Sequence, residues 1–328
     1  MKLQFIVSNQ TEPYWNIAVE NYLVERDEGA NYQGSANCPV LYLWRNRRTV
    51  VIGQNQNPYS EVNVEALEAD GGFLMRRKTG GGAVYHDDGN LNFSFVVPKA
   101  LYDQQRQFSV IQRAVESFGL HTELSGRNDI LAEGRKFSGN AFSKGRINDL
   151  HHGTLLIKGD MSDLARYLKP KPAKLQKHGV QSVRSRVVNL AELNPEITPE
   201  SIAPRLREAF EAEYGGVASE FPFESLMQMP AVRELHDHFA SDGWKYGRWR
   251  TFTAQCSAQF DWGGVELALT VDESRGIITD VQIASDALDL AALDEARRLL
   301  TGASTQQCPA GGMGSESSVI NDILSLVY

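Results

Sequence analysis

The chain contains the stretch Arg76-Arg77-Lys78-Thr79-Gly80-Gly81-Gly82-Ala83-Val84-Tyr85-His86-Asp87. Its three successive glycines remove every side chain from a turn, so backbone N–H groups can approach a ligand closely and form an anion-binding concavity. The cations before the glycines would add positive charge where a phosphate sits. The spacing fits neither the P-loop nor the dinucleotide-binding fingerprint. These residues alone leave two interpretations open, a phosphate- or carboxylate-binding turn and an ordinary tight turn.

A second polar segment surrounds Lys136, which follows a predicted hairpin turn at Gly134. Lys136 stands among small residues, and a single ammonium there could reach both a carboxylate and a phosphate. Asp129, across the same predicted hairpin, would either orient that lysine or hold Mg²⁺ bound to a triphosphate. The alternative is a solvated lysine with a local turn at Asp129.

Charge is distributed unevenly along the chain. The 328 residues carry a formal net charge of -8, but the section from Arg76 to Leu190 holds 19 Lys/Arg against 10 Asp/Glu. A basic section in an acidic protein is expected of a site for a polyanion, such as a nucleoside triphosphate, a nucleic acid or an acidic partner protein. A solvated basic face without a ligand is the other interpretation.

Length and composition predict an ordinary globular protein of either one large domain or a large and a small domain, and we favour two domains. No apolar run approaches the ~20 residues that span a bilayer, and the first residues lack the apolar region of a signal peptide, so we expect a cytoplasmic protein that does not use a membrane. Cys38, Cys256 and Cys308 have neither metal-ligand nor disulfide spacing, and we expect them to pack as apolar side chains. The adjacent pair His151-His152 lies in a predicted strand, where neighbouring side chains point to opposite faces, so we reject a metal site there. One of the two should face the ligand side.

The first half of the chain alternates predicted strands with a few helices. Strands linked by short turns favour an α+β fold with a mixed or antiparallel sheet and flanking helices over a parallel doubly wound sheet. We expect the following elements: helices over 14–23 and from Ser109 to Gly119, a hairpin of strands 39–44 and 49–53, a strand at 90–97 with one buried face, a hairpin at Gly134, a strand at 151–157, and a helix that starts at Asp160 or Ser162.

The second half of the chain predicts a domain boundary near residue 247. Residues 170–188 hold two prolines and several basic residues, which indicates an exposed loop near the site. A helix should open at Thr198-Pro199 and end before Gly215, and strands at 252–262, 265–271 and 277–284 then restart the pattern. We therefore expect a large domain of residues 1–246 and a small αβ domain of residues 247–328, with a helix at 290–300 and another after Ser317.

The motifs together resemble the lipoate-protein ligase family in its long, two-domain bacterial form. Matching segments follow in order along nearly the whole chain: 14–20, 43–46, 51–58, 76–87, 125–129, 135–139, 151–156, 182–187 and 262–267. An ordered series of this length is specific. The chain departs from the family pattern after Thr301, where residues 302–318 are rich in glycine and serine, so the structure after residue 301 stays open.

The resemblance implies a catalytic domain similar to those of biotin ligases and class II aminoacyl-tRNA synthetases, followed by an accessory domain. It implies that lipoate and ATP, accompanied by Mg²⁺, form lipoyl-AMP, and that a lysine of an acceptor protein then takes the lipoyl group. The implied acceptors are the lipoyl domains of 2-oxoacid dehydrogenase complexes and the glycine cleavage H protein. By motif position, the implied site residues are Arg77, Gly82, Ala83, Val84 and Tyr85 for the nucleotide, Lys136 for both the lipoyl carboxylate and the adenylate phosphate, and Asn128 and Asp129 as weaker matches.

Several alternatives compete with this hypothesis. An octanoyl- or lipoyl-transferase on a similar fold would pass the acyl group through a cysteine thioester, but no cysteine occurs between Cys38 and Cys256. A biotin ligase fits the glycine stretch less well, and a nucleic-acid-binding module would need an aromatic stacking platform beside the basic residues. A non-catalytic lipoate- or nucleotide-binding protein stays open, although the presence of Arg77 and Lys136 argues for activity.

Two features of ligand and partner recognition are expected from less direct signals. Lipoate needs an apolar slot, and the strands around Val51 and Phe93 are candidates because we expect them to share one sheet. The basic loop from Pro170 to Arg186 is expected to meet an acidic acceptor protein.

Overall fold

The structure is a computed structural model that describes residues 1–26, 38–126, 128–169, 187–246, 254–272, 276–305, 308–309 and 315–328. Eight strands join one sheet in the order β11-β1-β2-β6-β10-β9-β8-β7. Their bounds are β1 (Lys2–Val7), β2 (Val40–Trp44), β6 (Asn90–Pro98), β7 (Thr122–Ser125), β8 (Asp129–Ala132), β9 (Arg135–Lys144), β10 (Asn148–Leu156) and β11 (Val217–Glu220). β1 pairs in parallel with β2 and β11, whereas the other neighbours are antiparallel. The mixed sheet expected from the sequence is confirmed.

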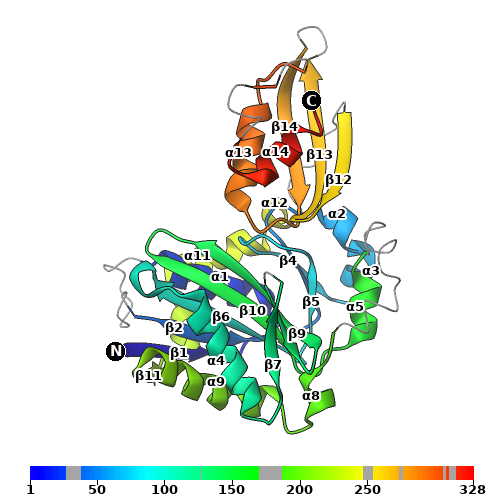
Figure 1. Ribbon diagram of the computed structural model, residues 1–328. Helices are drawn as coiled ribbons and strands as arrows, with labels where there is room; N and C mark the ends of the chain where they lie inside the picture. The colour runs from blue at the N-terminus through cyan, green and yellow to red at the C-terminus, as the bar shows by residue number, and fades with distance from the viewer. Residues whose placement is uncertain are drawn as a thin grey trace.

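Helices cover both faces of this sheet (Figure 1). Those of one face are α4 (Gln104–Glu116) and α9 (Pro199–Tyr214), and those of the other are α1 (Pro13–Glu25), α10 (Phe223–Met227) and α11 (Pro230–Ala240). Phe93 of β6 packs into the core beneath α4 and α9, and Val96 of the same strand packs into the core beneath α1. Every residue of β6 is buried as a result. The strand was expected to have one buried face, and both faces are buried because helices lie over both sides.

A second, three-stranded sheet contains β4, β3 and β5 in that order. Its bounds are β3 (Thr49–Ile52), β4 (Phe73–Arg76) and β5 (Val84–His86), and the helices α2 (Pro58–Glu61), α3 (Val64–Ala69) and α5 (Met161–Tyr167) belong to the same cluster or border it. The glycine-rich turn connects β4 to β5. β3 pairs with these two strands and not with β2, so the predicted hairpin of strands 39–44 and 49–53 is wrong. The segment between β2 and β3 is held against α1, because buried Asn46 in this segment accepts a hydrogen bond of 3.0 Å from Asn16 of α1.

Local sequence signals set the ends of the helices. Thr198 caps α9 and Gly215 ends it in the left-handed conformation, as predicted. α4 begins earlier than predicted, because the Asp103 side chain accepts hydrogen bonds from two backbone N–H groups of its first turn. Ser109 lies inside α4, so the predicted start of this helix at Ser109 is wrong. The predicted stop at Gly119 is present, with a φ of 81° just after the helix.

The C-terminal part of the chain forms a separate three-stranded antiparallel sheet with two helices packed on it. Its elements are β12 (Ala254–Phe260), β13 (Gly263–Asp272), β14 (Ile277–Ser285), α13 (Leu290–Leu300) and α14 (Ser318–Leu324). The helix expected after Ser317 is confirmed. The predicted boundary near residue 247 and the basic segment 170–186 lie outside the described residues.

The C-terminal sheet meets the rest of the chain at the glycine-rich turn. The Gly81 N–H donates to the carbonyl of Ala287 at 3.1 Å, and the Ser285 N–H donates to the carbonyl of Asn55 at 2.9 Å. The short helix α12 (Asp242–Lys245) lies between the two bodies in the view of Figure 1. This placement brings residues of the C-terminal sheet over the turn.

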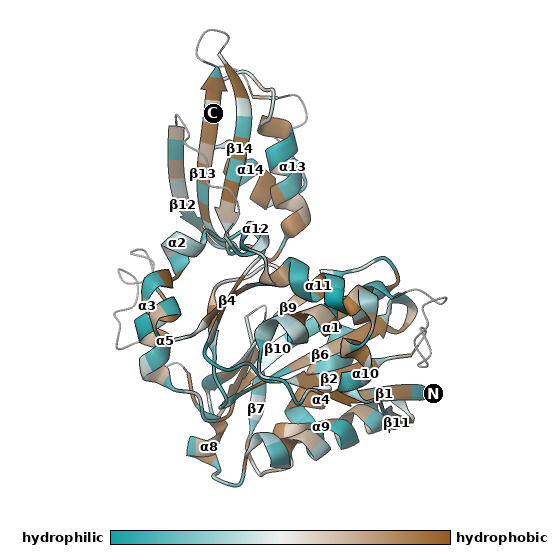
Figure 2. Ribbon diagram, turned by 180° about the vertical axis from the view of Figure 1, so that it is seen from behind, coloured by the Kyte–Doolittle hydropathy of each residue, from teal (hydrophilic) through white to brown (hydrophobic). Residues whose placement is uncertain are grey.

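The distribution of apolar residues agrees with these layers. Figure 2 shows apolar colour along β2 in the middle of the large sheet and polar colour on the outer surface of α11. Among the described residues, no helix combines the length and the apolarity that crossing a bilayer requires.

Candidate active site

A cleft of about 620 Å³ opens between the glycine-rich turn, the large sheet and the edge of the C-terminal sheet. The turn contributes Gly81 to Val84 to its lining, and β2, β6, β9 and β10 contribute further lining residues. Residues 259, 261–263, 286 and 288 of the C-terminal part line it as well. Such a volume is in the range of small-molecule sites, and the lining mixes apolar and polar side chains as those sites do.

The predicted hairpin brings Lys136 and Asp129 together in this cleft. Glu133 and Gly134 both have positive φ values, 50° and 74°, and form the two-residue turn between β8 and β9. Lys136 Nζ lies 2.7 Å from Asp129 Oδ1, and each side chain is 34% exposed. We call these two residues the mouth pair. The predicted proximity of Asp129 and Lys136 across the hairpin is present, and the contact is compatible with the orienting role, one of the two roles that the sequence left open for Asp129.

Asn128 holds the hairpin together more than it faces a ligand. Its side-chain N–H donates to the carbonyl of Asn140 at 2.8 Å, and the Asn140 side chain returns a bond of 3.0 Å to the Asn128 carbonyl. Asn140 also contacts His151 through Oδ1, at 2.8 Å from the ring Nε2. The two amides therefore fix β9 against the strand end that carries Asp129.

Arg77 shapes the glycine-rich turn from inside. Its guanidinium donates to Thr79 Oγ1 at 3.0 Å and to the carbonyls of Gly80 and Gly82 at 2.7 and 2.9 Å. The side chain lines the cleft but is only 7% exposed, and burial lowers its pKa to about 10. Arg77 thus lines the cleft beside the glycine-rich turn, and it directs much of its hydrogen-bonding capacity to the backbone of that turn.

Arg76 points away from the cleft. Its guanidinium donates to the carbonyl of Gln56 at 2.7 Å and to that of Lys245 at 2.8 Å. The Trp244 indole N–H in turn donates to the Arg76 carbonyl at 2.8 Å. The expectation that both arginines add charge beside a phosphate does not hold for Arg76, because this side chain joins α12 to the loop after β3.

The three glycines of the turn have different surroundings. A Cβ on Gly80 would lie 2.2 Å from the carbonyl oxygen of Ala287, so only glycine permits the C-terminal sheet to approach this closely. Gly81 has a φ of 94° and donates its N–H to the same carbonyl. A Cβ on Gly82 would meet no described atom within 4 Å, and Gly82 lines the cleft. The sequence predicted an anion-binding role for all three glycines, whereas Gly80 and Gly81 form the contact with the C-terminal sheet at Ala287.

The remaining residues of the turn divide between the cleft and the core. Ala83 and Val84 line the cleft with Gly82. The Tyr85 side chain is buried on the other side, where its hydroxyl donates to Asp163 at 3.0 Å and its ring packs on Tyr167. The structure therefore does not bring the Tyr85 side chain into the cleft with the other predicted nucleotide residues.

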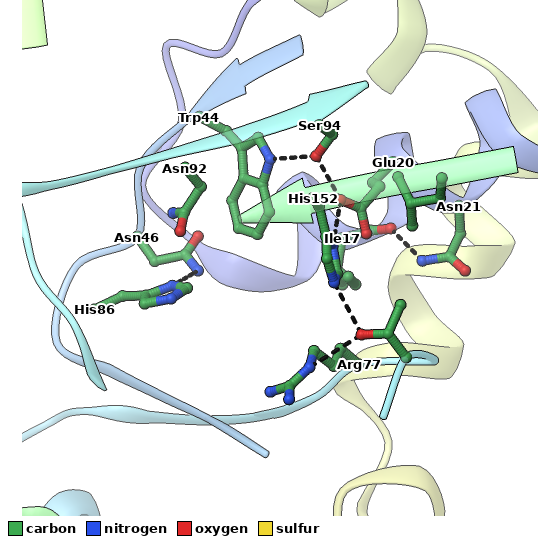
Figure 3. A network of polar contacts seen from close by, with 12 residues as sticks. Ile17, Glu20, Asn21, Trp44, Asn46, Arg77, His86, Asn92, Ser94 and His152 are labelled. Atoms are coloured by element: carbon green, nitrogen blue, oxygen red, sulfur yellow. Dashed lines mark hydrogen bonds and ion pairs between the residues drawn. The ribbon is translucent and has the colours of Figure 1, made fainter. Parts of the chain in front are cut away.

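A buried polar network that the sequence did not predict lies at the inner end of the cleft (Figure 3). Glu20 Oε2 is 2.8 Å from His152 Nδ1, and it also accepts a hydrogen bond from Ser94. His152 Nε2 is 2.8 Å from Thr79 Oγ1, which accepts from Arg77. We call the connected side chains Trp44, Ser94, Glu20, His152, Thr79 and Arg77 the inner network. Glu20 is a charged residue in a helix whose residues are nearly all buried. This combination could have indicated the network.

The two adjacent histidines face opposite sides, as predicted. His152 belongs to the inner network and lines the cleft. His151 packs between the rings of Phe108 and Phe142 on the other face, where burial lowers its pKa. Of the two, His152 alone is placed to meet a ligand in this cleft.

An apolar wall completes the inner part of the cleft. Its members are Ile17, Trp44, Val51 and Met75, which belong to one buried cluster. Val51 was predicted as a slot residue and lines the cleft. Phe93 was predicted on the same sheet as Val51, which is wrong, because Val51 lies on β3 of the small sheet and Phe93 lies in the core beneath α4.

A cleft on a mixed sheet that combines a lysine at the mouth, an open glycine turn and an apolar wall is suited to a ligand with an anionic part and an apolar part. The lipoyl protein ligase A/B catalytic domain family matches residues 12–211, and the bacterial lipoate protein ligase C-terminal family matches residues 250–308. The chain therefore belongs to the lipoate-protein ligase family. The family, the α+β fold and the ligase function predicted from the sequence are confirmed.

Individual relatives agree with this assignment. The chain is 39% identical over 301 residues to lipoate-protein ligase A of Psychrobacter cryohalolentis. The aligned region covers 90% of this chain and 86% of that protein. It is similar to the crystal structure of P. falciparum LipL1 in complex with lipoate, with a TM-score of 0.81, 31% identity, and coverage of 92% of this chain and 90% of that one. A lipoate-protein ligase A bound with ATP is also similar, with a TM-score of 0.63, 25% identity, and coverage of 75% and 99%.

Proposed function

We propose that the chain activates free lipoate with ATP to form lipoyl-AMP and pyrophosphate, and then transfers the lipoyl group to a lysine of an acceptor protein. The observation that carries this proposal is the mouth pair, which places the Lys136 ammonium at the edge of a cleft with an apolar interior. Lipoate is a carboxylate on an apolar tail, so its two parts match the two parts of the cleft. The relatives solved with lipoate and with ATP support both substrates.

In the first half-reaction, a lipoate carboxylate oxygen attacks the α-phosphorus of ATP, and the bond from that phosphorus to pyrophosphate breaks. Negative charge on the phosphate oxygens increases in the transition state, so preorganised cations and N–H donors accelerate the step. The Lys136 ammonium would contact the carboxylate and the α-phosphate together. The backbone of Gly82, Ala83 and Val84, which lines the cleft without a bulky side chain at Gly82, would follow the nucleotide. Arg77 would act by holding this turn in shape. Tyr85 would contact the nucleotide through its backbone alone, because its side chain points away from the cleft.

Mg²⁺ enters this scheme as part of the ATP substrate. Magnesium usually binds through one or two carboxylates together with substrate phosphates. Asp129 lines the cleft and has the oxygen ligands that Mg²⁺ prefers, although its Oδ1 contacts Lys136. We propose that Asp129 orients Lys136 first and that its second oxygen is the one available to the metal.

In the second half-reaction, the neutral ε-amine of the acceptor lysine attacks the carbonyl carbon of lipoyl-AMP. An amide bond forms, the bond to the AMP oxygen breaks, and the amine releases a proton. We propose the lipoyl domains of 2-oxoacid dehydrogenase complexes and the glycine cleavage H protein as acceptors. We also propose the division of labour expected from the sequence, with adenylate formation in residues 1–246 and an accessory role for residues 247–328.

A thioester mechanism is the main alternative, and the position of the cysteines speaks against it. None of the described residues that line the cleft is a cysteine. Cys38 is buried at 2% exposure, and this burial raises the pKa of its thiol, which makes it a poor nucleophile. The ligase chemistry needs no such residue.

The test is ATP-pyrophosphate exchange by the purified protein with Mg²⁺ and either lipoate, octanoate or biotin. Exchange with lipoate, followed by a mass increase of an added lipoyl domain, would establish both half-reactions. Binding of lipoate without exchange would identify a non-catalytic binder instead. Acyl transfer from a thioester donor without ATP would favour the transferase.

A further inference from the structure

Two buried N–H groups in the cleft have no hydrogen-bond partner in the described part of the chain. They are His86 Nε2 and Asn92 Nδ2, and both side chains line the cleft. His86 is 3% exposed and Asn92 is 1% exposed. A buried donor without an acceptor is costly, and native proteins satisfy nearly all such groups. A bound molecule that brings lone pairs to this place would satisfy them.

The proton position on His86 follows from its neighbours. The Asn16 side-chain N–H group donates to the carbonyl of Arg45 at 2.8 Å and to Asn46 Oδ1 at 3.0 Å. The amide nitrogen of Asn46 therefore faces His86 Nδ1, at 3.2 Å, and must donate to it. The proton of the neutral ring then lies on Nε2. Burial lowers the pKa of His86 to about 3, with Arg77 and His152 adding to the effect, so this N–H is a donor at every working pH.

Asn92 is oriented in a similar way. Its Oδ1 accepts a hydrogen bond of 2.9 Å from the side chain of Asn90, and in this arrangement Nδ2 is the end without a partner among the described residues. In the sheet, Asn92 of β6 is paired directly with Trp44 of β2. The backbone of a central strand therefore fixes the position of this donor.

Both donors lie in the apolar part of the cleft, next to Trp44. The His86 ring packs edge to face against the Trp44 ring, with centroids 6.2 Å apart. Trp44 belongs to the apolar wall with Ile17, Val51 and Met75. Figure 3 shows Trp44, Asn92 and His86 on the side of the network opposite Asn21. The mouth pair, in contrast, lies on the hairpin of β8 and β9.

We propose that His86 and Asn92 determine acyl-tail specificity by favouring a tail with lone pairs, such as the disulfide of lipoate, over a saturated tail such as that of octanoate. This inference rests on the proposed function. Thioether and disulfide sulfurs are weak acceptors, so lipoate satisfies the donors in part, whereas a hydrocarbon leaves them buried and unpaired. A site that presents hydrogen-bonding groups discriminates strongly against a ligand that lacks them.

The first test uses the unmodified protein and a series of acids in ATP-pyrophosphate exchange. The acids are lipoate, octanoate and 6-oxooctanoate, whose ketone places an acceptor on a carbon that carries sulfur in lipoate. We expect kcat/KM for lipoate and for 6-oxooctanoate to exceed that for octanoate by roughly tenfold, on the scale of one unpaired buried donor. Equal values for the three acids would overturn the inference, even though exchange itself would uphold the proposed function.

The second test removes the donors with side chains of similar size. His86→Phe and Asn92→Leu should each shift the lipoate-to-octanoate ratio of kcat/KM toward octanoate by about tenfold. Val51→Ala is the matched control, because it trims the same wall without removing a donor and should lower kcat/KM for both acids alike. Variants that lose activity with both acids equally would show that the donors hold water or support the fold, which contradicts a role in selection. Thermal midpoints identify any variant that fails to fold, and the acid series on the unmodified protein then decides.

Discussion

The mouth pair and the inner network differ chiefly in burial. Lys136 and Asp129 are in contact at 2.7 Å with 34% of each side chain exposed, whereas His152 and Glu20 are in contact at 2.8 Å with 9% and 1% exposed. Water already solvates the first pair, so its partners can separate at little cost when a ligand arrives. The second pair cannot separate without leaving a buried polar group unpaired. The comparison predicts that the mouth pair controls rate and that the inner network controls stability.

The largest expected effect is on the rate, from Lys136→Ala. This variant removes the cation that would meet the growing charge on the α-phosphate, and we expect adenylation to fall roughly a hundredfold to a thousandfold with the thermal midpoint unchanged. Pyrophosphate exchange and a melting curve measure the two quantities. Asp129→Asn serves as the companion variant, because it keeps the cation and loses only its orientation, and its loss should be smaller. An unchanged rate in a folded Lys136→Ala protein would remove this residue from the mechanism.

The inner network should respond in the opposite way. Glu20→Leu leaves Ser94 and His152 without their shared acceptor in a buried site, so we expect the free energy of unfolding to fall by about 2–4 kcal/mol. Glu20→Gln keeps an acceptor oxygen and should lose less. Urea denaturation of both variants checks the order. Equal unfolding midpoints for Glu20→Leu and the unmodified protein would show that the network does not stabilise the fold.

The sequence predicted the mouth pair and missed the inner network for a physical reason. Asp129 and Lys136 lie on adjacent strands joined by a two-residue turn, so a local signal brings them together. Glu20 and His152 are separated by 132 positions, and His152 and Thr79 by 73. The contacts of His152 with Glu20 and Thr79 depend on which strands are neighbours in the sheet. A single sequence gives little information on the order of the strands. The same limit explains the wrong hairpin, because β2 and β3 each have correct strand patterns but pair with other strands.

The glycine-rich turn shows a related limit. Three glycines predict a turn with an accessible backbone, and Gly82 agrees with this. The sequence could not indicate that Gly80 and Gly81 face a strand end more than two hundred residues later, at Ala287. The family motifs name several residues that line the cleft, Arg77, Gly82 and Lys136 among them, without indicating how folding brings them together.

Substitutions of Gly80 and Gly82 can distinguish an effect on stability from an effect on nucleotide binding. Gly80→Ala would place a Cβ 2.2 Å from the Ala287 carbonyl, so the C-terminal sheet must shift, and we expect a loss of about 1–3 kcal/mol in the free energy of unfolding. Gly82→Ala meets no described atom within 4 Å and should change stability by less than about 0.5 kcal/mol. A rise in KM for ATP in Gly82→Ala would then report contact with the nucleotide. Similar melting curves for the two variants would contradict the assigned contact with the C-terminal sheet.

The last expected effect is a pH dependence of stability, which arises from buried histidines. Burial lowers the pKa of His86 to about 3 and that of His151 as well, whereas a histidine in the unfolded chain has a pKa near 6.5. Between these values the unfolded state binds more protons, so the stabilising contribution is complete above pH ~6.5 and is lost as the pH falls toward the folded value. At pH ~5.5 His86 should cost about 1.2 kcal/mol of stability relative to neutral pH, and His151 should contribute in the same direction. Urea unfolding at the two pH values measures the difference, and His86→Gln should reduce it by one histidine's share. A stability that is independent of pH in this range would mean that the rings are accessible to protons in the folded state, and the assignment of His86 as a permanent neutral donor would fail with it.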